Sequence, residues 1–411
     1  MIKKLFTQIK NEKFSNLWLA MELLLVSVIL WYVVDFLYVN IITYHEPKGF
    51  DIEHCYLIKV GTLTEKSPDY LSNWTKDDAN VDMAELLKRF QLRPDIEAAS
   101  LSQYSYPYCV TTSTDVVQYD TLRSLRTYLK VVSPDFVKVF RYKGAQGESP
   151  EQLAALLDQG NILASNNLFA NYGYELTEFV GKQFCLFDDN NNSYRLGASI
   201  RNVRLHEYEQ ACNAACLLMK QSYYWPDMEL CVRVREKMDV DFIERLMADS
   251  ESQFRVGNLF VADVRSFKDI RRVYLQKWTN DIRNYVMGMN FLLLNIFLGL
   301  LGTFWFRTQQ RRSEIALHKV HGATSRAVFG RLIAEGICLL FIVTPFAIVI
   351  DACLADLGLN AVYNSTTLEW KRLWFCAGIG FVLIVLMICI GVGIPAWQAM
   401  KVEPTEALHD E

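Results

Sequence analysis

Four long apolar runs constrain what this chain can fold into more than any other feature of its sequence. The clearest is Tyr285–Phe306, about 22 residues without a charged side chain, where a helix needs about 20 residues to cross the hydrocarbon core of a membrane. The other three runs have similar lengths and few charges. We therefore expect transmembrane helices at 17–40, 285–306, 332–354 and 373–394.

The section between the first two apolar runs, residues 41–284, has the residue mixture of a water-exposed domain. Alternating apolar and polar residues predict strands at Tyr56–Val60 and Ala98–Tyr104, and a hairpin of Gln183–Phe187 with Ser193–Ile200 around an Asp/Asn-rich turn. Helical spacing predicts three helices, at Val81–Phe90, Glu151–Leu157 and Val240–Asp249. The expected fold is an α-helical membrane protein with four transmembrane helices plus a large α+β domain between helices 1 and 2.

The distribution of Lys and Arg predicts the orientation, because short loops rich in these residues stay in the cytoplasm. Residues 1–16 are rich in lysine, and 307–331 contain one acid, Glu314, against six basic residues, namely Arg307, Arg311, Arg312, Lys319, Arg326 and Arg331. The loop 355–372 lacks such an excess. Both termini, including the tail 395–411, are then cytoplasmic, and the α+β domain is extracytoplasmic.

Residues 265–283 return the chain to the membrane and allow two interpretations. They are polar but keep helical spacing, so they form either a stalk that continues the second transmembrane helix outward or a solvated connector. The sequence alone leaves both open.

The loop between the second and third runs carries a specific motif. The segment 311–324 reads RRSEIALHKVHGAT and resembles the R-x-x-E-I-A-x-x-K-x-x-G-A-[ST] signature of the FtsX/MacB-like family of ABC transporter permeases. Other segments resemble the same family: 131–149, 160–186, more loosely 193–204, and the tail with Pro395, Trp397 and Pro404. The likeness is weakest over residues 45–130, whose role stays open.

This resemblance implies a coupling helix that docks on a cytoplasmic ABC ATPase, with ATP and Mg²⁺ bound by that partner and no cofactor on this chain. Leu317 and Val320 are three residues apart and share a helical face, which charged residues surround. We therefore assign ATPase coupling to Arg311, Arg312, Glu314, Ile315, Leu317, Lys319, Val320 and Gly322. The alternative is a solvated basic loop that only obeys the orientation rule.

Polar and small residues inside the spans are further candidates for function. Glu22 and Glu335 form a candidate intramembrane polar site, because a charge in the hydrocarbon core is costly. For Glu22, three alternatives stay open: placement at the interface, pairing with a basic group, or lining the contact between two permeases. Asp35 is expected at the interface. Gly378, Gly380 and Gly391 are expected to allow close packing of helices, within the chain or in a dimer.

Several kinds of chemistry find no support in the sequence. It has no G-x-x-x-x-G-K-[ST] phosphate loop, no H-E-x-x-H or G-x-S-x-G motif and no metal-spaced His/Cys set, so we expect no catalytic, cofactor or metal site. The lack of a long basic run argues against nucleic acid. The ten cysteines include no C-x-x-C pair. Cys212 and Cys216 could share a helical face, but we interpret them as ordinary thiols.

Together these features favour a permease subunit in the bacterial inner membrane that transmits ATP-driven motion of its ATPase to a periplasmic domain. The expected task is export of a drug, peptide or lipoprotein from the periplasm. The resemblance implies a dimer with a second copy or a paralogue, and it makes a periplasmic adaptor and an outer-membrane exit duct candidate partners. One alternative is a signalling subunit that activates a periplasmic cell-wall hydrolase without moving a substrate. Another is a membrane-anchored receptor, which leaves the basic segment and the tail motif unexplained.

Overall fold

The protein is represented here by a computed structural model that describes residues 13–124, 126–186, 192–210, 215–310, 324–362 and 366–401. It divides into two compact units. The helical unit takes its described residues from Met1–Ile42 and Asn280–Glu411, and the sheet unit is Thr43–Thr279. Each unit is described by itself below.

Four long helices supply the helical unit, two of them continuing into the sheet unit: α2 (Lys13–His45), α7 (Phe267–Gln310), α9 (Ser325–Asp356) and α10 (Trp370–Lys401). Each contains a segment long and apolar enough to cross a membrane, namely Leu17–His45, Phe267–Thr303, Phe329–Asp356 and Trp370–Gly393. The expectation of four apolar helices of spanning length is confirmed. Of the two interpretations of residues 265–283, the helical one is correct from Phe267 onward, since α7 continues without a break to Gln310.

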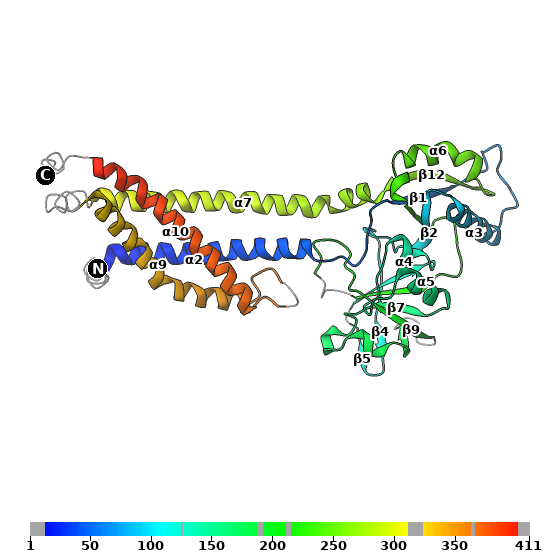
Figure 1. The fold of residues 1–411 in the computed structure, drawn as a ribbon, viewed down its shortest axis with the longest axis horizontal. Coiled ribbons are helices and arrows are strands. Elements are labelled where there is room, and N and C mark those ends of the chain that lie inside the picture. Colours follow the sequence, from blue (N-terminus) through cyan, green and yellow to red (C-terminus); the bar gives the residue numbers. More distant parts are fainter. Residues whose placement is uncertain are drawn as a thin grey trace. The chain divides into compact units, whose positions relative to one another are not determined.

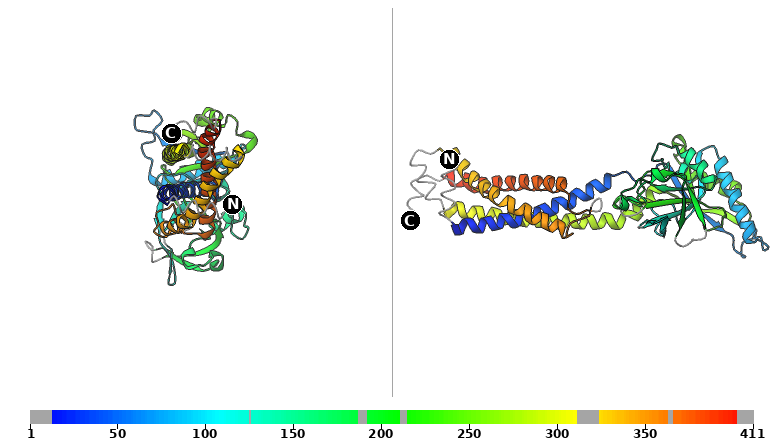
Figure 2. Two further views of the ribbon diagram at one scale, coloured as in Figure 1. Left: turned by 90° about the vertical axis from the view of Figure 1, so that its left-hand side faces the viewer. Right: turned by 90° about the horizontal axis from the view of Figure 1, so that it is seen from below.

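The interior of the helical unit is apolar and draws on all four helices. Leu30 and Trp31 of α2 pack in one cluster with Leu300 of α7, Leu340 of α9 and Ile384 of α10. Figure 2 shows α9 crossing α2 at an angle, and both helices contribute to this apolar cluster. Thr324 caps the start of α9, because its hydroxyl accepts a hydrogen bond from the backbone N–H of Ala327.

The ends of these helices are segregated within the unit. The first residues of α2, the end of α7, the start of α9 and the end of α10 lie at one end of it, whereas the α9–α10 connection lies at the other (Figure 1).

The sheet unit is built on twelve strands in the order β12-β1-β11-β2-β6-β10-β7-β9-β8-β4-β5, with β3 paired to β6. The strands are β1 (Cys55–Thr62), β2 (Ile96–Gln103), β3 (Ser113–Asp115), β4 (Val117–Tyr119), β5 (Leu122–Arg123), β6 (Thr127–Val132), β7 (Ile162–Ser165), β8 (Gln183–Leu186), β9 (Ser193–Ile200), β10 (Ala215–Lys220), β11 (Glu229–Val234) and β12 (Leu259–Ser266). The pairs β6–β10 and β7–β9 are parallel and the other pairs are antiparallel.

Helices and short 3₁₀ turns complete this unit. They are α3 (Lys76–Leu92), α4 (Phe136–Val139), α5 (Pro150–Asp158), α6 (Phe242–Gln253), η1 (Ala170–Tyr172), η2 (Leu176–Phe179) and η3 (Glu236–Met238). The predicted strands at 56–60 and 98–104, the hairpin and the three predicted helices are confirmed as β1, β2, β8–β9, α3, α5 and α6. Figure 1 shows α6 beside β12 and α3 beside β2.

Alternation along the strands divides the core into two layers. Ile58 of β1 belongs to one buried cluster, with Phe90 of α3 and Phe242 of α6. Its neighbour on the same strand, Cys55, belongs to another cluster, with Phe136 of α4. Because successive side chains of a strand point to opposite faces, this part of the sheet is covered on both sides. An α+β domain was therefore the correct expectation.

One local interpretation was wrong. Cys216 does not lie on a helix, because it is in β10, where it is a buried free thiol. The run from Ala215 to Lys220 has no polar residue before its last position, which is typical of a fully buried strand and does not distinguish it from a helix by periodicity. Cys212 lies outside the described residues.

Candidate functional site

A buried ion pair joins α2 to α10 in the helical unit. Arg372 donates from Nε to Oδ1 of Asp35 at 2.6 Å and from Nη2 to Oδ2 at 2.5 Å, the two-bond geometry that makes arginine–carboxylate pairs strong. Asn360 adds a third hydrogen bond to Asp35, at 2.5 Å. Asp35 is 0% exposed and Arg372 2%, so the pair fastens the first apolar helix to the last.

This arrangement bears on two expectations. Placement of Asp35 at the membrane interface stays a prediction, and the structure adds that its carboxylate is fully buried against α10. Arg372 was assigned to the external loop 355–372, yet it lies in the first turn of α10, which begins at Trp370. A signal was present in the sequence: the two opposite charges lie at the outer ends of two predicted spans, where pairing would avoid a solitary buried charge.

The acids that the sequence singled out lie elsewhere in the same unit. Glu22 of α2 accepts a hydrogen bond from the hydroxyl of Thr303 on α7, at 3.3 Å. Glu335 lies in α9 and is 5% exposed. Glu22 shares α2 with Asp35 but lies several turns away from it, and Glu335 is on another helix. An intramembrane role for Glu22 and Glu335 stays a prediction.

The three glycines assigned to helix packing differ in their surroundings. A Cβ atom at Gly380 would lie 3.9 Å from Cγ of Leu30 and from the backbone nitrogen of Trp31, so this glycine faces α2. At Gly378 no atom lies within 4 Å of such a Cβ, and Gly391 is buried. Of these three glycines, Gly380 is the one whose surroundings place it against another helix, α2.

In the sheet unit, Arg204 ties its own loop to the segment through which the chain enters the fold. Its guanidinium group donates to the carbonyl oxygens of Thr43 at 2.7 Å, Pro47 at 3.3 Å, Glu207 at 3.1 Å and Glu209 at 2.9 Å, and also to that of Glu46. The side chain is buried. These acceptors include the end of α2, so one arginine fixes the residues where the chain passes from α2 into the sheet unit.

Glu207 joins the same region to α7. One of its carboxylate oxygens accepts hydrogen bonds from Arg271 of α7 at 2.6 Å, the Tyr108 hydroxyl at 2.8 Å and Lys48 at 3.1 Å. Burial alone would raise the pKa of Glu207, but the charge of Lys48 and the hydrogen bonds from Tyr108 and Arg271 hold that pKa below its usual value. The buried carboxylate is therefore ionised and paired at neutral pH.

His206, the neighbouring residue, packs on the same part of α7. Its ring centroid lies 4.5 Å from that of Trp278 and 5.8 Å from that of Tyr274. Burial between these rings lowers the pKa of His206 to about 4, because the apolar surroundings disfavour the charged form. The imidazole is therefore neutral at physiological pH. We call Arg204, His206, Glu207 and Arg271 the junction cluster.

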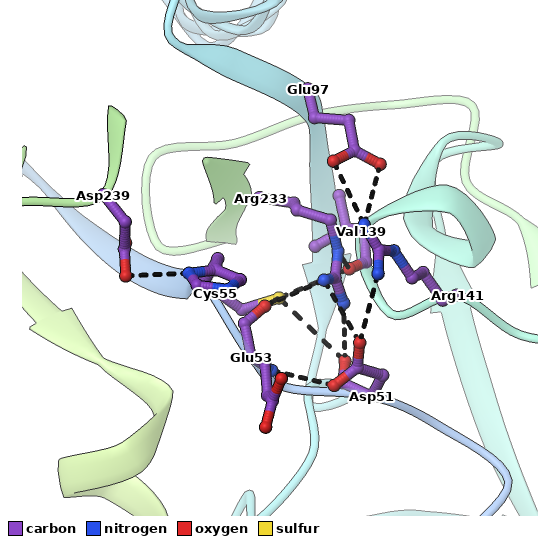
Figure 3. A network of polar contacts seen from close by, with 9 residues as sticks. Asp51, Glu53, Cys55, Glu97, Val139, Arg141, Arg233 and Asp239 are labelled. Atoms are coloured by element: carbon purple, nitrogen blue, oxygen red, sulfur yellow. Dashed lines mark hydrogen bonds and ion pairs between the residues drawn. The ribbon is translucent and has the colours of Figure 1, made fainter. Parts of the chain in front are cut away.

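A second polar network surrounds the buried Arg233 of β11 (Figure 3). Its guanidinium group donates to the backbone oxygens of Val139 at 2.6 Å, Glu53 at 2.8 Å and Asp51 at 3.0 Å. The Cys55 thiol contacts the Val139 oxygen at 3.3 Å, and burial raises its pKa to about 12, so it stays protonated. Arg233 and Cys55 both donate to backbone carbonyl oxygens. This network therefore has a structural role, and Cys55 is not a reactive thiol.

A pocket of about 360 Å³ opens on the sheet unit beside β1 and β12. Its lining combines aromatic side chains, Tyr104 and Tyr106, with charged ones, Lys59 and Glu229. Burial raises the pKa of Glu229, although Ser102 and the backbone N–H groups of Tyr104 and Ser105 donate to it. Part of the region 45–130, whose role the sequence left open, therefore lines a pocket with both polar and aromatic walls.

The comparisons with known proteins bear on the helical unit. Residues 286–404 match the family model of the FtsX-like permease C-terminal domain. Over these residues the chain is similar to an FtsX-like permease. The match begins inside α7 and extends past α10, so it includes the segment that carries the coupling motif.

Other comparisons are weaker. One similar solved structure is the periplasmic region of MacB from Actinobacillus actinomycetemcomitans, which is 12% identical in sequence to this protein. The alignment covers 56% of this protein and 96% of the MacB structure. The TM-score is 0.30, which is too low to assign the fold of the sheet unit. No curated protein sequence matches the permease.

The residues assigned to ATPase coupling lie outside the described part of the permease. Arg311, Arg312, Glu314, Ile315, Leu317, Lys319, Val320 and Gly322 all fall within 311–323, which the structure does not describe. The structure places the residues on either side, Gln310 at the end of α7 and Thr324 before α9, at the end of the helical unit that also holds the start of α2 (Figure 1). The coupling assignment stays a prediction.

Proposed function

We propose that this protein is the membrane subunit of an ABC transporter and transmits ATP-driven motion of a separate cytoplasmic ATPase to its extracytoplasmic sheet unit. The observation that carries the proposal is the match of residues 286–404 to the FtsX-like permease C-terminal domain. In this proposal ATP and Mg²⁺ are bound by the ATPase, and the chain itself performs no nucleotide chemistry. The transported substrate would be a drug, peptide or lipoprotein taken from the periplasm.

The arrangement of the helical unit supports the topology that this function needs. If the lysine- and arginine-rich segments 1–16 and 307–331 are cytoplasmic, then the end of the unit where α2 starts and α7 ends faces the cytoplasm. The coupling segment 311–323 would then meet the ATPase, and the sheet unit would lie on the periplasmic side.

The junction cluster is suited to transmit force into the sheet unit. Arg204 binds carbonyl groups at the end of α2, and Glu207 binds Arg271 of α7. Buried charge-assisted hydrogen bonds resist displacement, because breaking one leaves a buried charge without compensation. Movement of either helix end would therefore be passed to the loop that carries Arg204 and Glu207.

The decisive experiment measures ATPase stimulation. The permease is reconstituted in lipid nanodiscs with its ATPase, and wild type is compared with the Glu314→Ala/Leu317→Ala double variant. Loss of a charged and an apolar contact from a docking surface is expected to lower stimulation at least about tenfold, which corresponds to ~1.4 kcal/mol. The matched control is Gln309→Ala/Gln310→Ala, a pair of exposed polar residues at the end of α7.

Unchanged stimulation in the double variant would exclude the proposed docking role of the segment. Transport assays then separate the two functions that share this mechanism. Coupled ATPase activity without movement of any drug, peptide or lipoprotein, together with activation of a cell-wall hydrolase, would favour the signalling alternative over export.

A further inference from the structure

A small cavity lies between α2, α9 and α10 inside the helical unit. It has a volume of about 20 Å³ and is lined by Ser27 and Trp31 of α2, Thr344 and Asp351 of α9, and Gly380 of α10. A cavity must offer about 10–15 Å³ to hold one water molecule, and the water needs polar partners. This cavity meets the size requirement for one water molecule and not for a larger ligand.

Two polar atoms among its lining side chains have no hydrogen-bond partner within the described part of the chain. They are the indole nitrogen Nε1 of Trp31, a donor, and the carboxyl oxygen Oδ1 of Asp351, an acceptor. Both side chains are 2% exposed. An unsatisfied buried donor or acceptor is destabilising, and one water molecule that bonds to both atoms would satisfy them.

The other polar groups of the lining are already satisfied. The hydroxyl of Ser27 donates to the carbonyl of Leu23 at 2.7 Å, and that of Thr344 donates to the carbonyl of Leu340 at 2.7 Å. Neither needs the cavity. The demand for a bridging molecule therefore comes from Trp31 and Asp351 alone.

The surroundings of Asp351 disfavour an ionised side chain. It is almost fully buried, and its Oδ1 has no hydrogen-bond partner among the described residues, whereas a carboxylate in an apolar interior needs a partner to keep its charge. On α10, Arg372 is committed to Asp35 by two hydrogen bonds, and Cys376 contacts Asp35 at 3.6 Å. Arg372 therefore neutralises Asp35 and not Asp351, and a buried carboxyl group without a cationic partner favours its neutral form.

We propose that the cavity is a binding site for one water molecule and one proton. The proton converts the Asp351 carboxylate into a carboxylic acid, and the water accepts the N–H of Trp31 and donates to Oδ1 of Asp351. The site stabilises the packing of α2 against α9 and α10. It goes beyond the proposed coupling function and does not depend on it.

Infrared spectroscopy of the full-length protein in lipid nanodiscs tests the site directly. The wild type is expected to show the carbonyl band of a protonated carboxyl group at neutral pH, and that band is expected to disappear in Asp351→Asn. Asp356→Asn, an exposed acid at the end of the same helix, is the matched control and keeps the band. Absence of a neutral-pH band that depends on Asp351 would overturn the proposal.

A second variant tests the water and covers the case in which Asp351→Asn does not fold. Trp31→Phe keeps an aromatic ring and removes the N–H, so the Asp351 band is expected to persist at a shifted frequency because its water loses one partner. In the wild type the band should also shift when the protein is transferred to isotopically labelled water. A band that is insensitive to Trp31→Phe would show that no water connects the two side chains and would refute the site.

Discussion

At the scale of single residues, the charges inside the helical unit depend on partners that are distant in the sequence. Asp35 is on the first apolar helix and Arg372 on the last, yet each side chain satisfies the other. A buried ion pair contributes little net stability compared with an apolar pair, but removal of one partner is costly because the other charge remains. The pair thus constrains which helices can lie together.

Substitution of Arg372 is expected to destabilise the protein strongly. Arg372→Leu leaves the Asp35 carboxylate buried and unpaired, which should lower the free energy of unfolding by about 3–5 kcal/mol. Chemical unfolding of the full-length protein in detergent micelles measures this loss. Lys371→Leu, at the adjacent exposed position, should change the free energy by less than about 1 kcal/mol. The double variant Asp35→Leu/Arg372→Leu should recover most of the lost stability. If Arg372→Leu and Lys371→Leu lowered the free energy of unfolding equally, the role of the ion pair would be contradicted.

His206 is expected to make the stability of the sheet unit depend on mildly acidic pH. Burial lowers its folded-state pKa to about 4, whereas an unfolded histidine titrates near 6.5. The unfolded state then binds more protons than the folded state in this window, so stability is full above about pH 6.5 and falls as the pH drops towards about 4.

Unfolding curves of wild type and His206→Gln between these two pH values check that dependence. The variant should be less stable near neutral pH because it loses the stacking on Trp278, and it should have a flatter pH dependence. Glu207 contributes in a lower window, below its ordinary carboxyl range, because its folded-state pKa is lowered. A wild-type protein whose stability is constant down to about pH 4.5 would show that His206 is not buried as described.

At the scale of secondary-structure elements, close packing of α10 on α2 depends on Gly380. Gly380→Leu is expected to destabilise the helical unit by about 1–3 kcal/mol, because the added side chain must displace Leu30 or the α2 backbone. Gly378→Leu is the matched control, since no atom lies within 4 Å of a Cβ there. Thermal unfolding in detergent compares the two, and an equal loss from both variants would mean that α10 does not approach α2 at Gly380.

Local patterns predicted the elements well wherever one periodicity was strong. Alternation in Tyr56–Val60 and helical spacing in Val81–Phe90 correspond to β1 and α3, because half-buried strands and amphipathic helices show their faces in the sequence. The pattern failed at Cys216, since a fully buried strand such as β10 lacks alternation. The β6–β10 and β7–β9 pairings also left no local signal, because parallel neighbours are joined through distant parts of the chain.

At the scale of the whole molecule, the proposed orientation can be tested by chemical labelling. Val110→Cys places a thiol at a strongly exposed position of the sheet unit, and Lys319→Cys places one in the coupling segment. In intact cells whose outer membrane has been made permeable, a maleimide that cannot cross the inner membrane should label Val110→Cys above the wild-type background and leave Lys319→Cys at background. Lysed cells should label both. Labelling of Lys319→Cys in intact cells would reverse the orientation and exclude docking on a cytoplasmic ATPase.

The sequence by itself determined the four apolar helices, the mixed character of the intervening domain and the FtsX-like motif. These properties depend on length, local periodicity and residue identity within short segments. The tertiary structure alone decided that Asp35 meets Arg372, that Arg204 and Glu207 bind the ends of α2 and α7 in the sheet unit, and that Trp31 and Asp351 share a cavity. Such contacts join residues that are up to 337 positions apart, and their energy depends on which buried groups are brought within hydrogen-bonding distance, which no local pattern encodes.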